Sequence, residues 1–126
     1  MDTKKVWFIT GASRGLGLCL VKQLLATGQP VAATSRNAAE LSNAVGHHTD
    51  YFLPLQVDLA NEASVDQAIQ KTHDTFGRID VVINNAGYGI GGSIEELTDQ
   101  ETRDSFDVNV FGTVNVIRRV MPYLRQ

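Results

Sequence analysis

The chain has 126 residues and a mass of 13.7 kDa, of which 43% of residues are hydrophobic and 20% are charged. These values are typical of one globular domain that is large enough to bury a core of its own. Eleven Lys and Arg against fourteen Asp and Glu give a net charge of -3, and no basic run is present. The composition therefore argues against nucleic-acid binding.

The apolar segments are short. The longest uninterrupted runs are four residues, as at residues 6–9, far below the roughly 20 residues that cross a bilayer. They are also too short for the core of a secretory signal, and the single cysteine, Cys19, excludes an intramolecular disulfide. We therefore expect a cytoplasmic protein without a membrane span. Cys19 lies beside Leu16 and Leu20 on a predicted helix and is interpreted as a small core residue.

Strand-like and helix-like segments alternate along the chain. The apolar runs at residues 6–10, 31–34, 52–57 and 81–83 predict four strands. Helical patterns lie between them: residues 16–25 before Gly28, residues 38–45 before Gly46, and a segment that begins after Asn61 and ends at Gly77. Pro54 cannot donate a ladder hydrogen bond, so it is expected at a strand start or at a sheet edge.

The last part of the chain combines a loop with a helix. Residues 85–93 contain four glycines and form the longest predicted loop. Thr98, with Glu101 three positions later, has the form of a capping box that opens a long helix. The apolar residues of this helix keep helical spacing: Phe106, Val110, Val114, Ile117, Met121 and Leu124.

The alternation of elements predicts the fold class. Strands that are apolar on both faces indicate an α/β domain with a doubly wound parallel sheet, covered by helices on both sides. In such a domain the carboxyl ends of the strands lie along one crevice, and ligands bind there. The candidate functional residues are therefore those that directly follow the four strands.

The first strand ends in a glycine-rich turn, Thr10-Gly11-Ala12-Ser13-Arg14-Gly15-Leu16-Gly17. A helix that starts here offers free N–H groups to a phosphate, and the glycines allow a close approach, which favours pyrophosphate binding. A tight strand-to-helix turn alone would also need glycine. The turn matches the nucleophile elbow of serine hydrolases as well, with Ser13 as nucleophile, but no convincing Asp-then-His pair follows.

The second strand ends in Thr34-Ser35-Arg36-Asn37, without the acid that binds the ribose 2′-hydroxyl in NAD-binding domains. Arg36, together with Arg14 of the glycine turn, could hold a 2′-phosphate by charge-assisted hydrogen bonds. This favours NADP(H) over NAD(H). The alternative is that both arginines are solvated surface charges.

The third and fourth strands end in polar residues of ambiguous role. Asp58-Leu59 follows the third strand, and its carboxylate could contact a base or form a turn. Asn84-Asn85-Ala86-Gly87 follows the fourth, and amide side chains tie strands together as readily as they contact a ligand.

Together these motifs resemble those of the short-chain dehydrogenase/reductase family, over nearly the whole chain. The resemblance implies a Rossmann fold and an NAD(P)-dependent oxidoreductase that transfers hydride between the nicotinamide cofactor and a small-molecule carbonyl or alcohol substrate, and Arg36 and Arg14 favour NADP(H) as that cofactor. Asn109 matches the family asparagine that helps organise the proton relay, although it could also be a solvated polar residue. The cofactor-binding residues implied are Gly11, Ser13, Arg14, Gly15, Leu16, Gly17, Arg36, Asp58, Leu59, Asn85, Ala86 and Gly87.

Other family residues have no match, namely the catalytic serine and a tyrosine followed by lysine four positions later. We therefore expect residues 1–126 to be an incomplete NAD(P)-binding domain that lacks the fifth strand onward and is inactive alone. The alternative is a non-catalytic NADP-binding or regulatory module. The fourth strand would become an apolar edge, so we expect a homo-oligomer or another association that covers it.

Metal binding is not expected. His47, His48 and His73 are the only histidines, and no acid or cysteine is spaced to complete a site with them.

Overall fold

The computed structural model describes residues 4–46 and 49–126, and its four strands form one parallel sheet in the order β3-β2-β1-β4. The strands are β1 (Trp7–Ile9), β2 (Val31–Ser35), β3 (Phe52–Gln56) and β4 (Val81–Ile83). The helices are α1 (Gly15–Ala26), α2 (Ala38–Val45), α3 (Glu62–Phe76), α4 (Asp99–Phe106) and α5 (Thr113–Leu124). The predicted doubly wound α/β fold is confirmed.

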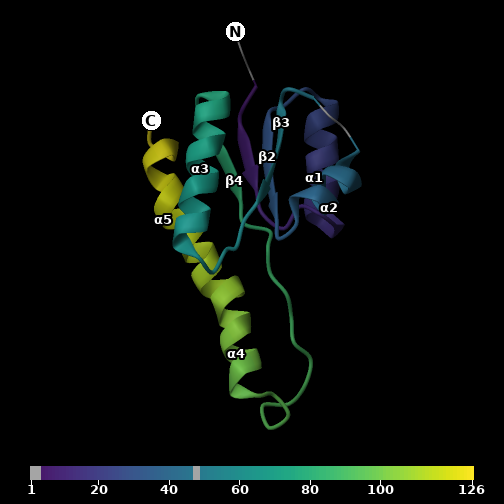
Figure 1. Cartoon of the computed structure of the whole chain (residues 1–126), viewed down its shortest axis with the longest axis vertical. Coiled ribbons are helices and arrows are strands. Elements are labelled where there is room, and N and C mark those ends of the chain that lie inside the picture. The colour runs from purple at the N-terminus through teal and green to yellow at the C-terminus, as the bar shows by residue number, and fades with distance from the viewer. Residues whose placement is uncertain (1–3, 47–48) are drawn as a thin grey trace.

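The helices cover the sheet on both sides (Figure 1), with α1 and α2 on one face and α3 and α5 on the other. Each face has its own buried cluster, one around Phe8, Val65 and Val116 and one around Ile9, Val21 and Leu41. Phe8 and Ile9, which are neighbours on β1, thus pack in opposite clusters, because successive side chains of a strand point to opposite faces of the sheet. This is why the strands read as continuous apolar runs.

The winding direction reverses after β3. The chain steps outward from β1 through β2 to β3 and then returns to place β4 on the other side of β1. Ile9 pairs with Ala33 on one side and with Ile83 on the other, so β1 and β4 end at the same level and β2 runs two residues further, to Ser35. Parallel sheets with this reversal place a crevice at the carboxyl ends of the strands, next to the reversal.

Local signals in the sequence set most of the element ends. Asn61 caps α3 by accepting a hydrogen bond from the Ser64 N–H at 3.2 Å, and Gly77 ends the helix with a φ of 81°. Thr98 caps α4 by accepting from the Glu101 N–H at 3.1 Å. Pro54 lies within β3, which is an edge strand, so the edge position predicted for it is confirmed.

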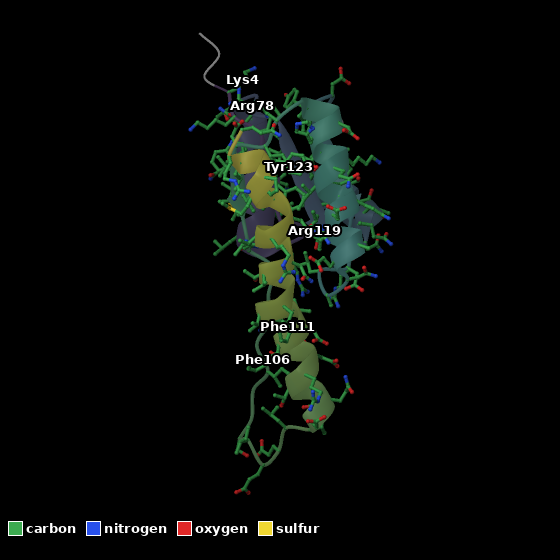
Figure 2. All side chains as sticks on the ribbon, turned by 90° about the vertical axis from the view of Figure 1, so that its left-hand side faces the viewer. Lys4, Arg78, Phe106, Phe111, Arg119 and Tyr123 are labelled. Carbon is green, nitrogen blue, oxygen red and sulfur yellow. The ribbon has the colours of Figure 1, made fainter. Side chains whose placement is uncertain are left out.

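The predicted long C-terminal helix buries one apolar side and exposes another. A π-helical segment, η1 (Asp107–Gly112), joins α4 to α5, and α5 buries Val116 and Val120. The apolar residues at helical spacing are largely exposed and form what we call the outer apolar face: Phe106, Val110, Phe111, Val114, Ile117 and Met121. Figure 2 labels Phe106 and Phe111 on the part of this helix that extends beyond the sheet. The helix has two apolar sides, and periodicity alone does not tell which of them faces the sheet.

Cys19 also differs from the prediction, because it is exposed. Helix α1 buries Gly17, Val21 and Leu25, which are four residues apart and share one face. Cys19 lies midway between two of these positions, on the opposite side of the helix.

Ion pairs join α3 to α5 across one face of the sheet. Glu62 accepts hydrogen bonds from Arg118 at 2.9 Å and from Arg119 at 3.0 Å. The hydrogen bond from Arg118 is the main cause that lowers the pKa of the Glu62 carboxyl. In Figure 2, Arg119 lies on α5 toward α3.

At the amino end of the sheet, Asp80 holds the start of β1. Its carboxylate accepts a hydrogen bond from the Val6 N–H at 2.8 Å and pairs with Arg78 at 2.7 Å. Burial raises the pKa of Asp80, but the hydrogen bonds from Arg78 and Val6 outweigh burial and lower it below its ordinary value of 3.8.

Asp80→Asn should therefore lower the free energy of unfolding at pH 6 by about 1 to 3 kcal/mol, as expected for hydrogen bonds to a charged group. Because the folded pKa is lowered, this stabilisation is complete above the unfolded pKa and is lost as the pH falls through the folded pKa. Urea unfolding at pH 6 and pH 3 measures the difference, with Asp74→Asn on the exposed side of α3 as the control. A difference of the same size at both pH values would contradict this role.

Candidate functional site

The end of β1 is joined to the segment after β4 by the side chain of Thr10. Its buried hydroxyl accepts hydrogen bonds from the backbone N–H groups of Asn85 at 3.1 Å and Ala86 at 3.0 Å. The Asn85 side-chain amide donates in turn to the carbonyl of Gly11 at 3.0 Å. Of the two roles that the sequence left open for these amides, the structure shows the strand-tying one for Asn85.

The glycines of the first turn meet three different environments. A Cβ at Gly11 would lie 2.8 Å from the Cα of Ala86, and one at Gly17 would overlap the Gly11 carbonyl oxygen. At Gly15, by contrast, a Cβ would meet nothing within 4 Å, although its φ of +63° favours glycine. Two glycines are thus required for packing of the turn, and the third borders open space.

The N-terminus of α1 has no side-chain cap and no acid in its first turn. The other three helices that follow a loop have both, with caps and acids supplied by Asn37 and Glu40, Asn61 and Glu62, and Thr98 and Asp99. The N–H groups at the start of α1 therefore remain available to an external anion, next to the positive end of the helix dipole. Ser13 is half-buried in this turn, and Leu16 is 82% exposed at the start of the helix.

The turn after β2 presents Arg36 beside this helix end. The Ser35 hydroxyl accepts from the Asn37 N–H at 3.0 Å, and Asn37 caps α2. Ala12 donates its N–H to the Thr34 carbonyl at 3.1 Å, which ties the turn to the glycine-rich segment. Arg36 and Arg14 are both exposed, and neither guanidinium is ion-paired within residues 4–46 and 49–126.

The turn after β3 is held by its own polar groups. Oδ1 of Asp58 accepts from the Ala60 N–H at 3.1 Å, and the Asp58 N–H donates to the Ser64 hydroxyl at 3.1 Å. The turn-forming role that was weighed for Asp58 is therefore present. The side chain is exposed, and its second carboxylate oxygen can still meet a ligand.

Asn109 lies in η1 and clamps the segment that follows Gly87. Its side-chain oxygen accepts from the Tyr88 N–H at 2.9 Å, and its amide donates to the Tyr88 carbonyl at 2.6 Å. A Cβ on Gly87 would lie 3.0 Å from the same oxygen. Asn109 is thus exposed, as the alternative expected, but its side chain is engaged with the segment after β4. π-Helical segments of this kind occur frequently at functional sites.

Two residues of this region do not stand out in the sequence. Thr10 was included only as the first residue of the glycine-rich motif, and the signal for its role is a hydroxyl residue directly after an apolar strand. Asn115 was not singled out, although it is buried and donates to the Leu59 carbonyl at 3.0 Å. Its signal is an amide three positions after Gly112 on a helix that is otherwise apolar on this side.

The described residues contain neither a membrane-spanning helix nor a cluster of metal ligands. No helix among the described residues is both long and apolar enough to span a membrane. His73 packs against the ring of Tyr123 with 4.9 Å between centroids, and no group of three potential metal ligands occurs in the part of the chain that the structure covers. His47 and His48 lie outside the described residues.

The family model described as short chain dehydrogenase matches residues 5–126, so the chain belongs to the short-chain dehydrogenase family. The resemblance inferred from the motifs is thereby confirmed. Oxidoreductase BOA17 of Botryotinia fuckeliana is 41% identical over 123 residues, which are 97% of this chain and 45% of that protein. The chain thus spans about half the length of the curated relatives it matches.

Solved structures of the family have the same architecture. A 3-ketoacyl-(acyl-carrier-protein) reductase from Brucella melitensis, complexed with NADH, is 32% identical with a TM-score of 0.89, over 94% of this chain and 50% of that one. An alcohol dehydrogenase from Thermococcus sibiricus, complexed with 5-hydroxy-NADP, is 30% identical with a TM-score of 0.82, over 97% and 54%. Relatives of both cofactor types therefore share this fold.

The glycine environments predict unequal effects of two alanine substitutions. In Gly17→Ala the added Cβ would overlap the Gly11 carbonyl oxygen and the Asn85 side-chain amide. The substitution should therefore lower the free energy of unfolding by about 3 kcal/mol, the upper range for overpacking. Gly15→Ala meets no atom and should cost only about 1 kcal/mol for its positive φ. Urea unfolding of both variants tests this, and equal losses would show that the turn is not packed as described.

Proposed function

We propose that this chain is the cofactor-binding part of an NADP(H)-dependent oxidoreductase, which transfers hydride between the nicotinamide and a carbonyl or alcohol substrate. The observation that carries the proposal is the uncapped N-terminus of α1 beside Gly15, at the carboxyl edge of the sheet. Free N–H groups and a helix dipole fit a pyrophosphate, and the open space at Gly15 lets one approach. Gly11, Ser13, Arg14, Gly15, Leu16 and Gly17 would form this part of the site.

The preference for NADP(H) over NAD(H) is supported by charge at the end of β2. Arg36 and Arg14 are exposed and are not ion-paired within the described ranges, whereas Arg78, Arg103 and Arg118 are paired. Ser35 and Asn37 are engaged in local hydrogen bonds, so Arg36 is the residue of this turn that can turn to a ligand. A guanidinium matches the 2′-phosphate of NADP(H) and lacks the acceptor that a 2′-hydroxyl of NAD(H) needs.

The other turns complete the proposed site. Asp58 and Leu59 would meet the adenine, and Asn85, Ala86 and Gly87 would line the cofactor beyond the pyrophosphate. When bound, the nicotinamide supplies or accepts the hydride. Asn109, the catalytic candidate, holds the backbone at Tyr88 through two hydrogen bonds and so fixes the wall of the site next to the β4 turn. We propose residues 1–126 as one NAD(P)-binding domain, and its cytoplasmic location stays a prediction.

The proposal is tested with the natural protein by measuring the affinities for NADPH and NADH and the oxidation of NADPH in the presence of carbonyl compounds. NADPH binding with carbonyl-dependent turnover supports it. Binding without any turnover indicates the non-catalytic module instead. Esterase activity that is lost in Ser13→Ala would favour the hydrolase interpretation, and no binding of either nucleotide would overturn the proposal.

Arg36→Asp should shift the cofactor preference toward NADH. Loss of one charge-assisted hydrogen bond costs about 1.5 to 3 kcal/mol, which corresponds to roughly ten- to a hundredfold in the ratio of the two dissociation constants. Arg125→Asp is the matched control, because Arg125 is also exposed but follows α5 at the opposite end of the sheet. An unchanged ratio in Arg36→Asp would count against the role of Arg36.

Association is proposed as well. Among the residues that the structure describes, strand β4 pairs with β1 alone, and the outer apolar face leaves Phe106 53% and Phe111 56% exposed. Apolar surfaces and bare strand edges of this kind drive contacts with other chains. The isolated 126-residue chain should therefore self-associate in sedimentation velocity, and Ile117→Glu on the outer face should reduce this. A monodisperse monomer at micromolar concentration would contradict the prediction.

A further inference from the structure

Where η1 meets α5, the helix approaches the backbone of the turn after β3 very closely. A Cβ at Gly112 would lie 3.0 Å from the Cβ of Leu59 and 3.6 Å from its carbonyl carbon. One turn further along, Asn115 is buried and its side-chain amide donates to the Leu59 carbonyl at 3.0 Å. The oxygen of the same side chain accepts from Arg118 at 3.2 Å, so both ends of the amide are engaged.

The hydrogen bonds of the turn itself do not fix its position relative to α5. Asp58 is bonded to Ala60 and Ser64, which belong to the turn and to α3. Among the described residues, the Asn115 amide is the side-chain donor that reaches the turn from α5. Loss of this donor would leave a half-buried carbonyl without its partner and would free the turn to move.

The same helix also holds the turn after β4. Asn109, in η1, clamps Tyr88 through two hydrogen bonds, and Asn115 follows on α5. The continuous helical segment formed by η1 and α5 therefore holds the turns that follow β3 and β4. The two turns lie at the carboxyl edge, where the adenine and the remainder of the cofactor are proposed to bind.

We propose that Asn115 is a positioning residue for the adenine part of the cofactor, acting through the Leu59 carbonyl on the Asp58–Leu59 turn. This rests on the proposed function. A residue that only braced α5 against α3 would change stability alone. A positioning residue changes the affinity for the adenine half of the cofactor and leaves the affinity for the nicotinamide half unchanged.

The test uses the natural full-length protein and three variants. Asn115→Leu removes the donor at similar volume, and Asn115→Asp removes the donor but keeps an acceptor for Arg118 in case the first variant does not fold. Glu62→Gln is the matched control, because it breaks the ion pairs of the same α3–α5 junction without touching the Leu59 bond. Calorimetric titration measures dissociation constants for 2′,5′-ADP, AMP and reduced nicotinamide mononucleotide, and urea unfolding measures stability.

Both Asn115 variants should bind the two adenine nucleotides more weakly, on the order of tenfold, as expected for the loss of about one hydrogen bond. Their affinity for the nicotinamide mononucleotide should stay within about twofold, and Glu62→Gln should lose stability but no affinity. Unchanged adenine affinity in a folded Asn115 variant, or an equal loss for both halves, would overturn the inference. If the unmodified protein binds none of the nucleotides, the proposed function fails instead.

Discussion

The Thr10 hydroxyl accepts hydrogen bonds from two backbone N–H groups that lie 75 and 76 positions later in the chain. The rest of the site depends on this junction between the end of β1 and the segment after β4. It fixes the end of β1 against the segment after β4, and the absence of a side chain at Gly11 lets the two backbones touch. A buried hydroxyl that accepts two hydrogen bonds satisfies the N–H groups of Asn85 and Ala86 and disfavours other arrangements of the two segments. The glycine-rich turn is thereby held on one side, while its other side borders open space at Gly15.

The consequences reach the whole carboxyl edge. From the junction, hydrogen bonds continue to β2 through Ala12 and Thr34 and to β3 through Val57 and Ser35. Asn115 of α5 is hydrogen-bonded to the turn after β3, and Asn109 of η1 is hydrogen-bonded to the segment after β4. The edge is therefore a connected layer, in which some polar groups hold the turns together and others remain available to a ligand. Arg14, Arg36 and the start of α1 belong to the second group.

The strands and the helix ends could be predicted because each has a local cause. Apolar runs mark buried parallel strands, Asn61 and Thr98 cap helices, and Gly77 ends one with a positive φ. The exposed side of the last helix could not be predicted in the same way. Its two apolar sides have similar periodicity, and only the packing of Val116 and Val120 against the sheet decides between them.

The residues of the site also differ in how far the sequence predicts them. The turns at the strand ends follow from topology, so Gly11, Arg36, Asp58 and Asn85 could be named from the sequence. Which atoms they engage depends on contacts between segments far apart in the chain. The motif indicates Asn85 but not the Gly11 carbonyl that its side chain binds, and nothing near Asn115 in the sequence indicates its contact with Leu59.

Hydrogen exchange of the natural protein, with and without NADPH, tests most directly whether the free helix end of α1 is the phosphate site. Backbone amides that bind a pyrophosphate exchange more slowly, so protection should be concentrated in residues 13–17, with a smaller effect at residues 35–37 and 58–60. The amides at the amino end of the sheet, near Asp80, should not change. Protection that leaves residues 13–17 unaffected would contradict the account, whatever the affinity for the nucleotide.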